Sequence, residues 1–186
     1  EQPDLWSLQA PQAAPRVPHQ ASNWSRHAID RFVITRLGEV GVEPAPRADR
    51  ATLVKRVYLD LLGLLPPPEV ALSFMEDATP DAYEKMVDRV LSSPHFGERW
   101  GRHWLDAARY ADSDGYEKDR PRPHAWRYRE WVIDAINRDL SYRDFSIQQI
   151  AGDLLPQAAS DVFAATGFHR NTLHNTEAVS YTHLRA

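Results

Sequence analysis

The sequence predicts an all-α protein: a compact domain of about seven helices that follows an extended, proline-rich N-terminal arm. Apolar residues recur at three- and four-residue steps along most of the chain, which is the period of an amphipathic helix. No segment alternates apolar and polar residues in the way a half-buried strand does. Glycine and helix-capping residues stand at the ends of the periodic segments, where helices begin and end.

The N-terminal part is predicted to form the arm followed by two helices. Residues 1–24 contain four prolines and sustain no helical period, which is typical of an extended linker. The first helix should open near Ser25 and end at Gly41, with these residues facing inward: Ile29, Phe32, Val33, Leu37 and Val40. Asp49 should cap a second helix that ends at Gly63, with these residues inward: Leu53, Val54, Val57 and Leu61.

Further helices follow from the same reasoning. The prolines of "LLPPPEV" form a rigid elbow into a short helix over residues 68–77. Thr79 is the expected cap of the next helix, with Pro80 in its first turn. Two longer helices, 94–111 and 123–140, flank a loop dense in charge and aromatic rings. A shorter helix over 143–154 and a glycine-interrupted stretch complete the predicted domain.

Bulk composition excludes several classes of protein. With 186 residues, 42% of them hydrophobic and six Trp, the chain is long enough for one domain with a sizeable core. A net charge of −4 without a basic run argues against nucleic acid as the main partner. No apolar run approaches the ~18 residues of a membrane span. Because there is no Cys, disulfides, Cys-ligated zinc and covalently attached c-type haem are excluded within this sequence.

Helix 94–111 should carry an apolar stripe beside a polar band. At 100° per residue the stripe is formed by Phe96, Trp100, Trp104, Ala107 and Ala111. The adjacent band is formed by Arg99, His103, Asp106 and Tyr110. Polar groups at the rim of an apolar stripe lose part of their hydration, so they must bond one another or a ligand.

Helix 123–140 places charged residues inside its apolar arc. The arc is formed by Tyr128, Val132, Ile133, Ala135, Ile136 and Leu140, yet Arg129 and Asp139 also fall within it. Because an unpaired buried charge costs several kcal/mol, we expect Arg129 to be paired. The acids within reach are Asp106, Asp112, Asp114, Glu117 and Asp119, so the loop "RYADSDGYEKDRPRPHAWRYREW" should fold back toward it. Two interpretations stay open, a structural ion-pair network and a functional polar cleft.

Three sets of candidate site residues follow. The catalytic candidates are His103, Asp106, Asp112 and Asp114, since Asp106 lies one turn from His103 and carboxylates can act as acid and base. The cofactor-binding candidates are Trp104, Tyr110 and Arg129. No metal site is predicted, although a partial match to a calcium loop is formed by Asp112, Asp114, Glu117 and Asp119. A solvated turn, the favoured interpretation, or internal partners for Arg127 or Arg129 would also explain those acids.

Several segments together resemble a known family. They are "IDRFVITRL", "ADRATLVKRVYLDLLGLLPPPEV", the run from "DAYEKMVDRV" to "AINRDL", "QQIAGDLLP" and "ATGFHRNT". In this order they resemble the planctomycete cytochrome-associated domain of unknown function, over about residues 24–177. The resemblance implies an exported protein, periplasmic or secreted, in which a C-x-x-C-H segment for haem c and further domains accompany this one. Residues 25–177 would be the helical domain.

The end of the sequence departs from the family's pattern. An acidic, glycine-containing stretch is expected after "NTLHNTE", but the sequence reads "AVSYTHLRA". These residues, 178–186, resemble a translated sequencing-adapter tail found in assembled metagenomic genes. We therefore expect these residues to be non-native and the sequence to be a truncated fragment.

Three functions remain open at this point, and the sequence does not decide whether the protein is an enzyme. The first is a non-catalytic helper module that packs beside a c-type haem segment of the parent protein. Other domains of that parent, or a redox partner, would then be its partners, with no cofactor held in this chain. The second is an exported hydrolase acting on polysaccharide through an Asp acid/base pair, which fails if those acids all pair with Arg. The third is a binding or scaffold domain without chemistry.

Overall fold

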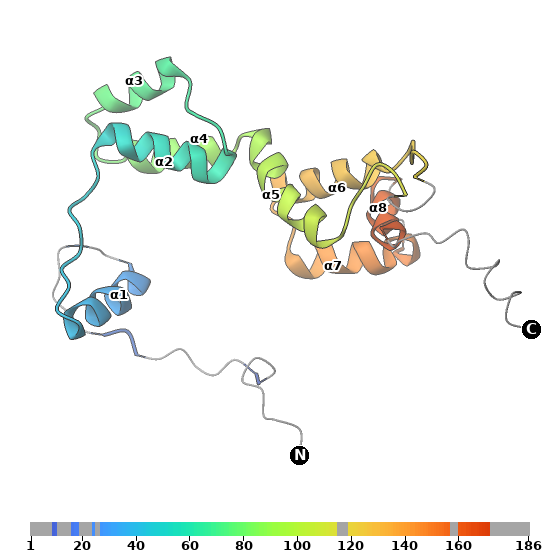
Figure 1. Ribbon diagram of the computed structural model, residues 1–186, viewed down its shortest axis with the longest axis horizontal. Helices are drawn as coiled ribbons and strands as arrows, with labels where there is room; N and C mark the ends of the chain where they lie inside the picture. Colours follow the sequence, from blue (N-terminus) through green and yellow to red (C-terminus); the bar gives the residue numbers. More distant parts are fainter. Residues whose placement is uncertain are drawn as a thin grey trace, which may run out of the picture. The chain divides into compact units, whose positions relative to one another are not determined.

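The computed structural model describes residues 9–10, 16–18, 24, 27–114, 119–156 and 160–171, and within them the prediction of an all-α fold is confirmed (Figure 1). The α-helices are α1 (Ala28–Glu39), α2 (Arg50–Leu62), α3 (Pro68–Glu76), α4 (Ala82–Leu91), α5 (Pro94–Ala107), α6 (Trp126–Asn137), α7 (Tyr142–Ala151) and α8 (Ser160–Ala165). The 3₁₀-helices among the described residues are η2 (Gly152–Leu154) and η3 (Thr166–Arg170). The chain divides into two units, Glu1–Ala48 and Asp49–Ala186.

The first unit contains α1, whose end follows the sequence prediction. Gly41 has a φ of 69°, and its N–H donates to the carbonyl of Gly38. The N–H of Val42 donates to the carbonyl of Leu37, so the helix ends in a Schellman motif. Within this unit no residue of α1 is buried, so the predicted inward face has no partner among the unit's own described residues. The exposed members of that face are Ile29, Phe32, Val33 and Val40.

The second unit begins with a hydrophobic cluster shared by α2, α3 and α4, which Figure 1 shows side by side. Its buried residues are Val54, Val57, Tyr58, Leu62, Phe74, Ala82, Met86 and Val90. The predicted ends of α2 are confirmed: the Asp49 carboxylate accepts from the N–H of Thr52 at 2.7 Å, and Gly63 has a φ of 71°. The hydrogen bonds from Thr52 lower the pKa of Asp49.

The predicted cap of α4 was wrong. Thr79 does not cap the helix; its own N–H and hydroxyl donate to the Asp77 carboxylate at 2.9 and 2.7 Å. These bonds hold the pKa of Asp77 below its usual range. Because Asp77 and Thr79 form a turn of their own, α4 begins later, at Ala82.

The second cluster lies where α5, α6, α7 and α8 meet. Its buried residues are Leu105, Tyr128, Trp131, Val132, Ala135, Phe145 and Ala165. Trp131, which the predicted arc of helix 123–140 omitted, stacks on Phe145 with ring centroids 5.1 Å apart. None of the helices in the described residues is long and apolar enough to span a membrane.

The predicted stripe of α5 was only partly right. Phe96 packs on the first cluster and Trp104 on the second, but Trp100 is 41% exposed and Ala111 lies beyond the end of the helix. The buried residues of α5 are Gly97, Gly101 and Leu105. The face of α5 that packs closely on α6 is therefore the face that carries the glycines. The predicted stripe of large side chains did not indicate this face.

The ends of α6 also differ from the prediction. The helix runs from Trp126 to Asn137, three residues shorter at each end than predicted. Asp139 has a φ of 51°, and the N–H of Leu140 donates to the carbonyl of Ala135 at 2.9 Å. Asp139 thus occupies the left-handed position of a Schellman motif, and it does not belong to the apolar arc.

Candidate functional site

The charged loop after α5 is folded onto itself. Arg109 has a φ of 58° and turns the chain out of the helix. Beyond it, Ser113 and Pro121 form an isolated antiparallel bridge. The N–H of Asp114 donates to the carbonyl of Arg120 at 3.0 Å, and the N–H of Arg122 donates to that of Asp112 at 2.7 Å. Backbone pairing therefore fixes where Asp112 and Asp114 stand.

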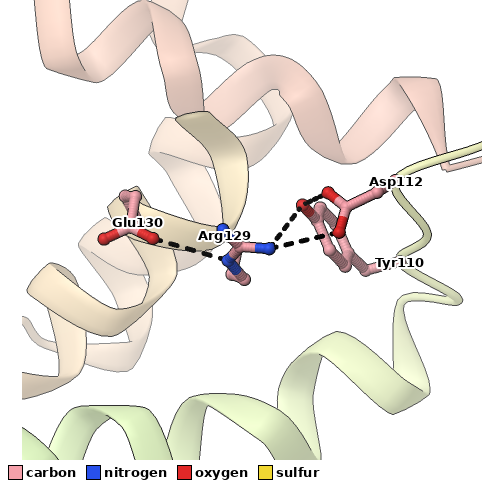
Figure 2. Close-up of polar contacts among 4 residues, drawn as sticks. All are labelled: Tyr110, Asp112, Arg129 and Glu130. Atoms are coloured by element: carbon pink, nitrogen blue, oxygen red, sulfur yellow. Dashed lines mark hydrogen bonds and ion pairs between the residues drawn. The ribbon is translucent and has the colours of Figure 1, made fainter. Parts of the chain in front are cut away.

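Arg129 receives the partner that the sequence predicted from the upstream loop. Figure 2 shows its guanidinium between Glu130 on one side and Asp112 with Tyr110 on the other. Its Nη1 lies 3.2 Å from Asp112 Oδ2 and 3.5 Å from Tyr110 OH, and its Nε lies 3.4 Å from Glu130 Oε1. The Tyr110 hydroxyl donates to the other Asp112 oxygen. The cluster thus joins the loop to α6.

The expectation that Arg129 points into a core was wrong. Its side chain is 37% exposed and that of Asp112 is 63% exposed, because the residue lies at the edge of α6 where the loop reaches it. Ion pairs in such positions contribute about 0.2–1 kcal/mol. Partial burial, followed by the hydrogen bond to Asp112, raises the pKa of Tyr110 and keeps its hydroxyl protonated as a donor.

A second ion pair ties the loop to η3. Arg122 Nε lies 2.7 Å from Asp114 Oδ1, and both side chains are only 20% exposed. The Nη1 of Arg122 donates to the carbonyl of Arg170 at 2.7 Å. Since charge-assisted bonds strengthen as water is excluded, this pair fixes the loop more firmly than Arg129 does.

The predicted catalytic residues do not converge. Asp106 lies 3.8 Å from Arg102 on the exposed side of α5, while the His103 ring packs near Trp100 with centroids 5.6 Å apart. Asp112 and Asp114 are paired as described above. Every carboxylate of the proposed acid/base set therefore has an Arg partner, which is the outcome that we expected to remove the hydrolase alternative.

The acids of the partial calcium motif separate in the same way. Asp112 and Asp114 bond different arginines, and Glu117 lies outside the described residues. Within the part of the chain that the structure describes, no group of three or more His, Asp or Glu side chains could hold a metal ion. The described residues of this loop therefore form no arrangement of acids that favours cation binding.

Trp104, a predicted cofactor-binding residue, is part of a polar network inside the second cluster. Its Nε1 donates to Tyr128 OH at 3.0 Å and to Gln149 Oε1 at 2.8 Å. Tyr128 OH also donates to Gln149 Oε1 at 2.7 Å, and Gln149 Nε2 donates to the carbonyl of Phe145. Burial raises the pKa of Tyr128 to about 12. Sequence reasoning missed Gln149 because a single Gln on a helix carries no sign of its burial.

A cavity of about 920 Å³ opens beside this network. Its walls are the loop segment 120–125, the first turn of α6, and residues 163–171 of α8 and η3, with Asp114 at one edge. Gly167 makes the wall possible, because a Cβ at this position would lie 2.8 Å from Tyr128 Cβ. Of the predicted site residues that the structure describes, only Asp114 lines the cavity.

The cavity is strongly cationic. Its charged lining residues are Arg120, Arg122, Arg127, Arg170 and Asp114, and two histidines, His124 and His169, stand beside them. Four arginines and one aspartate line it, and the aspartate carboxylate is bound by Arg122. A concave site with this charge can bind an anion. The sequence did not indicate this site, because the arginines of the cavity come from segments about 45 residues apart.

Comparison with known proteins identifies the family. The model of the PSCyt2 family, described as a protein of unknown function (DUF1549), matches residues 28–185. The chain belongs to the PSCyt2 family. The match covers α1 through η3, so both the ion-paired loop and the cavity are parts of the PSCyt2 domain. No curated protein and no solved structure matches the chain.

Proposed function

We propose that this PSCyt2 domain is a non-catalytic binding module that serves other domains of a larger, exported protein. The cationic cavity carries this proposal, because it offers charge and a shaped surface for a ligand. The acids beside the cavity form ion pairs with arginines that hold the loop against α6 and η3. Such pairs support the walls of a binding site and leave no opposed acid and base for hydrolysis.

The finer part of the proposal is that the partner carries haem c. It is supported by the resemblance to the planctomycete cytochrome-associated domain and by the family's name, PSCyt2. The chain has no Cys, so its residues do not fit covalent attachment of the haem. They do fit contact with the carboxylate edge of a haem held elsewhere, and Arg127 and Arg170 at the cavity would hold its propionates. The haem itself supplies electron transfer when bound.

Trp104, Tyr110 and Arg129 take a different place in this proposal from the one that the sequence suggested. None of them is among the residues that line the cavity. Trp104 packs in the second cluster, while Tyr110 and Arg129 hold the loop. We assign these three residues to the support of the site. Export to the periplasm or the cell exterior, and a redox partner reached through the haem, belong to the same proposal.

The experiment is an optical titration of the chain with a soluble haem c peptide that contains a C-x-x-C-H segment. We expect saturable binding that is weakened about a hundredfold in the double variant Arg127→Ala, Arg170→Ala, at roughly tenfold for each lost charged contact. Arg143→Ala, an exposed arginine on α7 outside the cavity, is the matched control. Equal binding by all three proteins, or no binding at all, would remove the haem link.

A further inference from the structure

We infer that the cavity is a site for a small organic anion that carries at least two carboxylate or phosphate groups beside an apolar part. This inference deepens the proposed function, and it rests on that function only in taking the cavity as the binding site. The ligand class follows from three features of the walls: unpaired positive charge, a buried amide donor without an acceptor, and an exposed aromatic ring.

Unpaired positive charge lines the cavity. Within the described residues, Arg120, Arg127 and Arg170 make no ion pair, whereas Arg122 is bound to Asp114. With the histidines neutral, the charged lining residues carry a net charge of +3, four arginines against one aspartate. Because guanidinium groups bind carboxylate and phosphate through two parallel N–H bonds, a ligand with two or more such groups matches this charge.

A buried donor points to the same chemistry. Asn171 lines the cavity, and its side-chain Nδ2 is buried without a hydrogen-bond partner in the described part of the chain. A buried N–H that lacks an acceptor costs about 1–3 kcal/mol. An oxyanion in the cavity would supply that acceptor, so binding would satisfy a donor that the protein by itself leaves unmatched.

The remaining wall is apolar. Phe163 lines the cavity with half of its surface exposed, and Tyr128, which also lines it, lies against Gly167. Apolar rings beside fixed charges select a ligand that has a hydrophobic body as well as anionic groups. Neighbouring bonds hold these features in place, since Arg122 donates to the carbonyl of Arg170 and so fixes the backbone of one of the unpaired arginines.

The test is calorimetric titration of the whole chain at low ionic strength with three probes: citrate, pyrophosphate and benzene-1,3-dicarboxylate. Citrate and the dicarboxylate present carboxylates, and pyrophosphate presents phosphates, so their order of affinity identifies the preferred group. We expect the double variant Arg127→Ala, Arg170→Ala to weaken binding about a hundredfold and Asn171→Leu about tenfold. Arg127→Lys should lose part of the affinity, because it keeps the charge without the planar fork.

Arg143→Ala, on α7 and outside the cavity, is the control and should bind as the parent chain does. An equal loss in this variant would show general attraction of anions to the surface and would overturn the inference, as would the absence of binding by all three probes. Binding of the haem c peptide without binding of the small anions would overturn this inference and leave the proposed function standing. The converse result would support the anion site and refute the haem link.

Discussion

Gln149 illustrates how one polar side chain can organise a core. It is 2% exposed, and its single carbonyl oxygen accepts from both the Trp104 indole and the Tyr128 hydroxyl. Its amide nitrogen donates to the carbonyl of Phe145 one turn earlier on α7. Three helices are thereby joined through one residue. Because the Tyr128 hydroxyl is buried, loss of the acceptor leaves this donor without water as a substitute, whereas the partly buried Trp104 indole keeps the Tyr128 oxygen.

We therefore predict that Gln149→Ala lowers the free energy of unfolding by about 2–4 kcal/mol, since it removes the acceptor of the buried Tyr128 hydroxyl and one of the two acceptors of the Trp104 indole, and leaves a cavity at a fully buried position. Urea denaturation followed by circular dichroism measures the change. The neighbouring Gln148→Ala, at a residue that is only half-buried, is the matched control and should cost less than about 1 kcal/mol. Similar losses for the two variants would mean that the network contributes little.

The raised pKa of Tyr128 predicts a dependence of stability on alkaline pH. In the unfolded chain a tyrosine loses its proton near pH 10, while burial raises the folded-state pKa to about 12. Between these values the folded state binds more protons than the unfolded state, so stability falls as pH rises. Urea midpoints measured from pH 8 to 12 should fall less steeply for Tyr128→Phe than for the parent chain. Parallel curves would contradict the assignment.

At the scale of elements, α5 is the helix that belongs to both hydrophobic clusters of the second unit. Phe96 near its start packs on the first cluster, and Leu105 near its end is buried in the second. Between them Gly97 and Gly101 face α6, and Asn137 accepts from the N–H of Gly97 at 2.8 Å. The absence of side chains at the two glycines is what allows the helices to approach.

The two glycines give a matched pair of variants. A Cβ at Gly97 would lie 2.5 Å from the carbonyl oxygen of Ile133, so Gly97→Ala should destabilise the protein by about 1–3 kcal/mol as the helices separate. At Gly101 the nearest atom, Ile133 Cγ1, would be 3.4 Å away, which is ordinary contact. Alanine also favours a helix by up to about 1 kcal/mol, so Gly101→Ala should be neutral or stabilising. Thermal melting of both variants checks the contrast.

At the scale of the molecule, burial is confined to one of the two units. Every residue that is buried in the described part of the chain lies in Asp49–Ala186, where both hydrophobic clusters are found. In Glu1–Ala48 the described helix, α1, has no buried residue. The apolar area that stabilises a fold is therefore concentrated in the second unit.

A fragment of residues 49–186 should accordingly fold without the first 48. We predict a cooperative thermal transition within about 4 °C of that of the parent chain, which corresponds to roughly 1 kcal/mol for a domain of this size. Circular dichroism at 222 nm during heating measures both transitions. A fragment that melts without cooperativity would show that the first unit contributes to the core.

Much of the helical framework could be predicted from local sequence. Asp49 and Gly63 bound α2 as expected, because a capping carboxylate and a left-handed glycine act on neighbouring backbone groups. An acidic partner for Arg129 from the upstream loop was also predicted, because a partly buried guanidinium favours an acid nearby, and the structure shows that this partner is Asp112. Asp139 was wrongly assigned to the apolar arc of the helix, because the helical period of the sequence continues past the point where α6 ends.

By itself, then, the sequence determined the all-α class, the positions of most helices and the loop that supplies a partner for Arg129. These properties depend on interactions between residues close in the chain, which spacing and residue type encode. Only the tertiary structure decided which face of α5 is buried, that Gln149 joins three helices, and that arginines from the loop and from η3 surround one cavity. Such features depend on how closely distant segments approach, and that distance is set by packing.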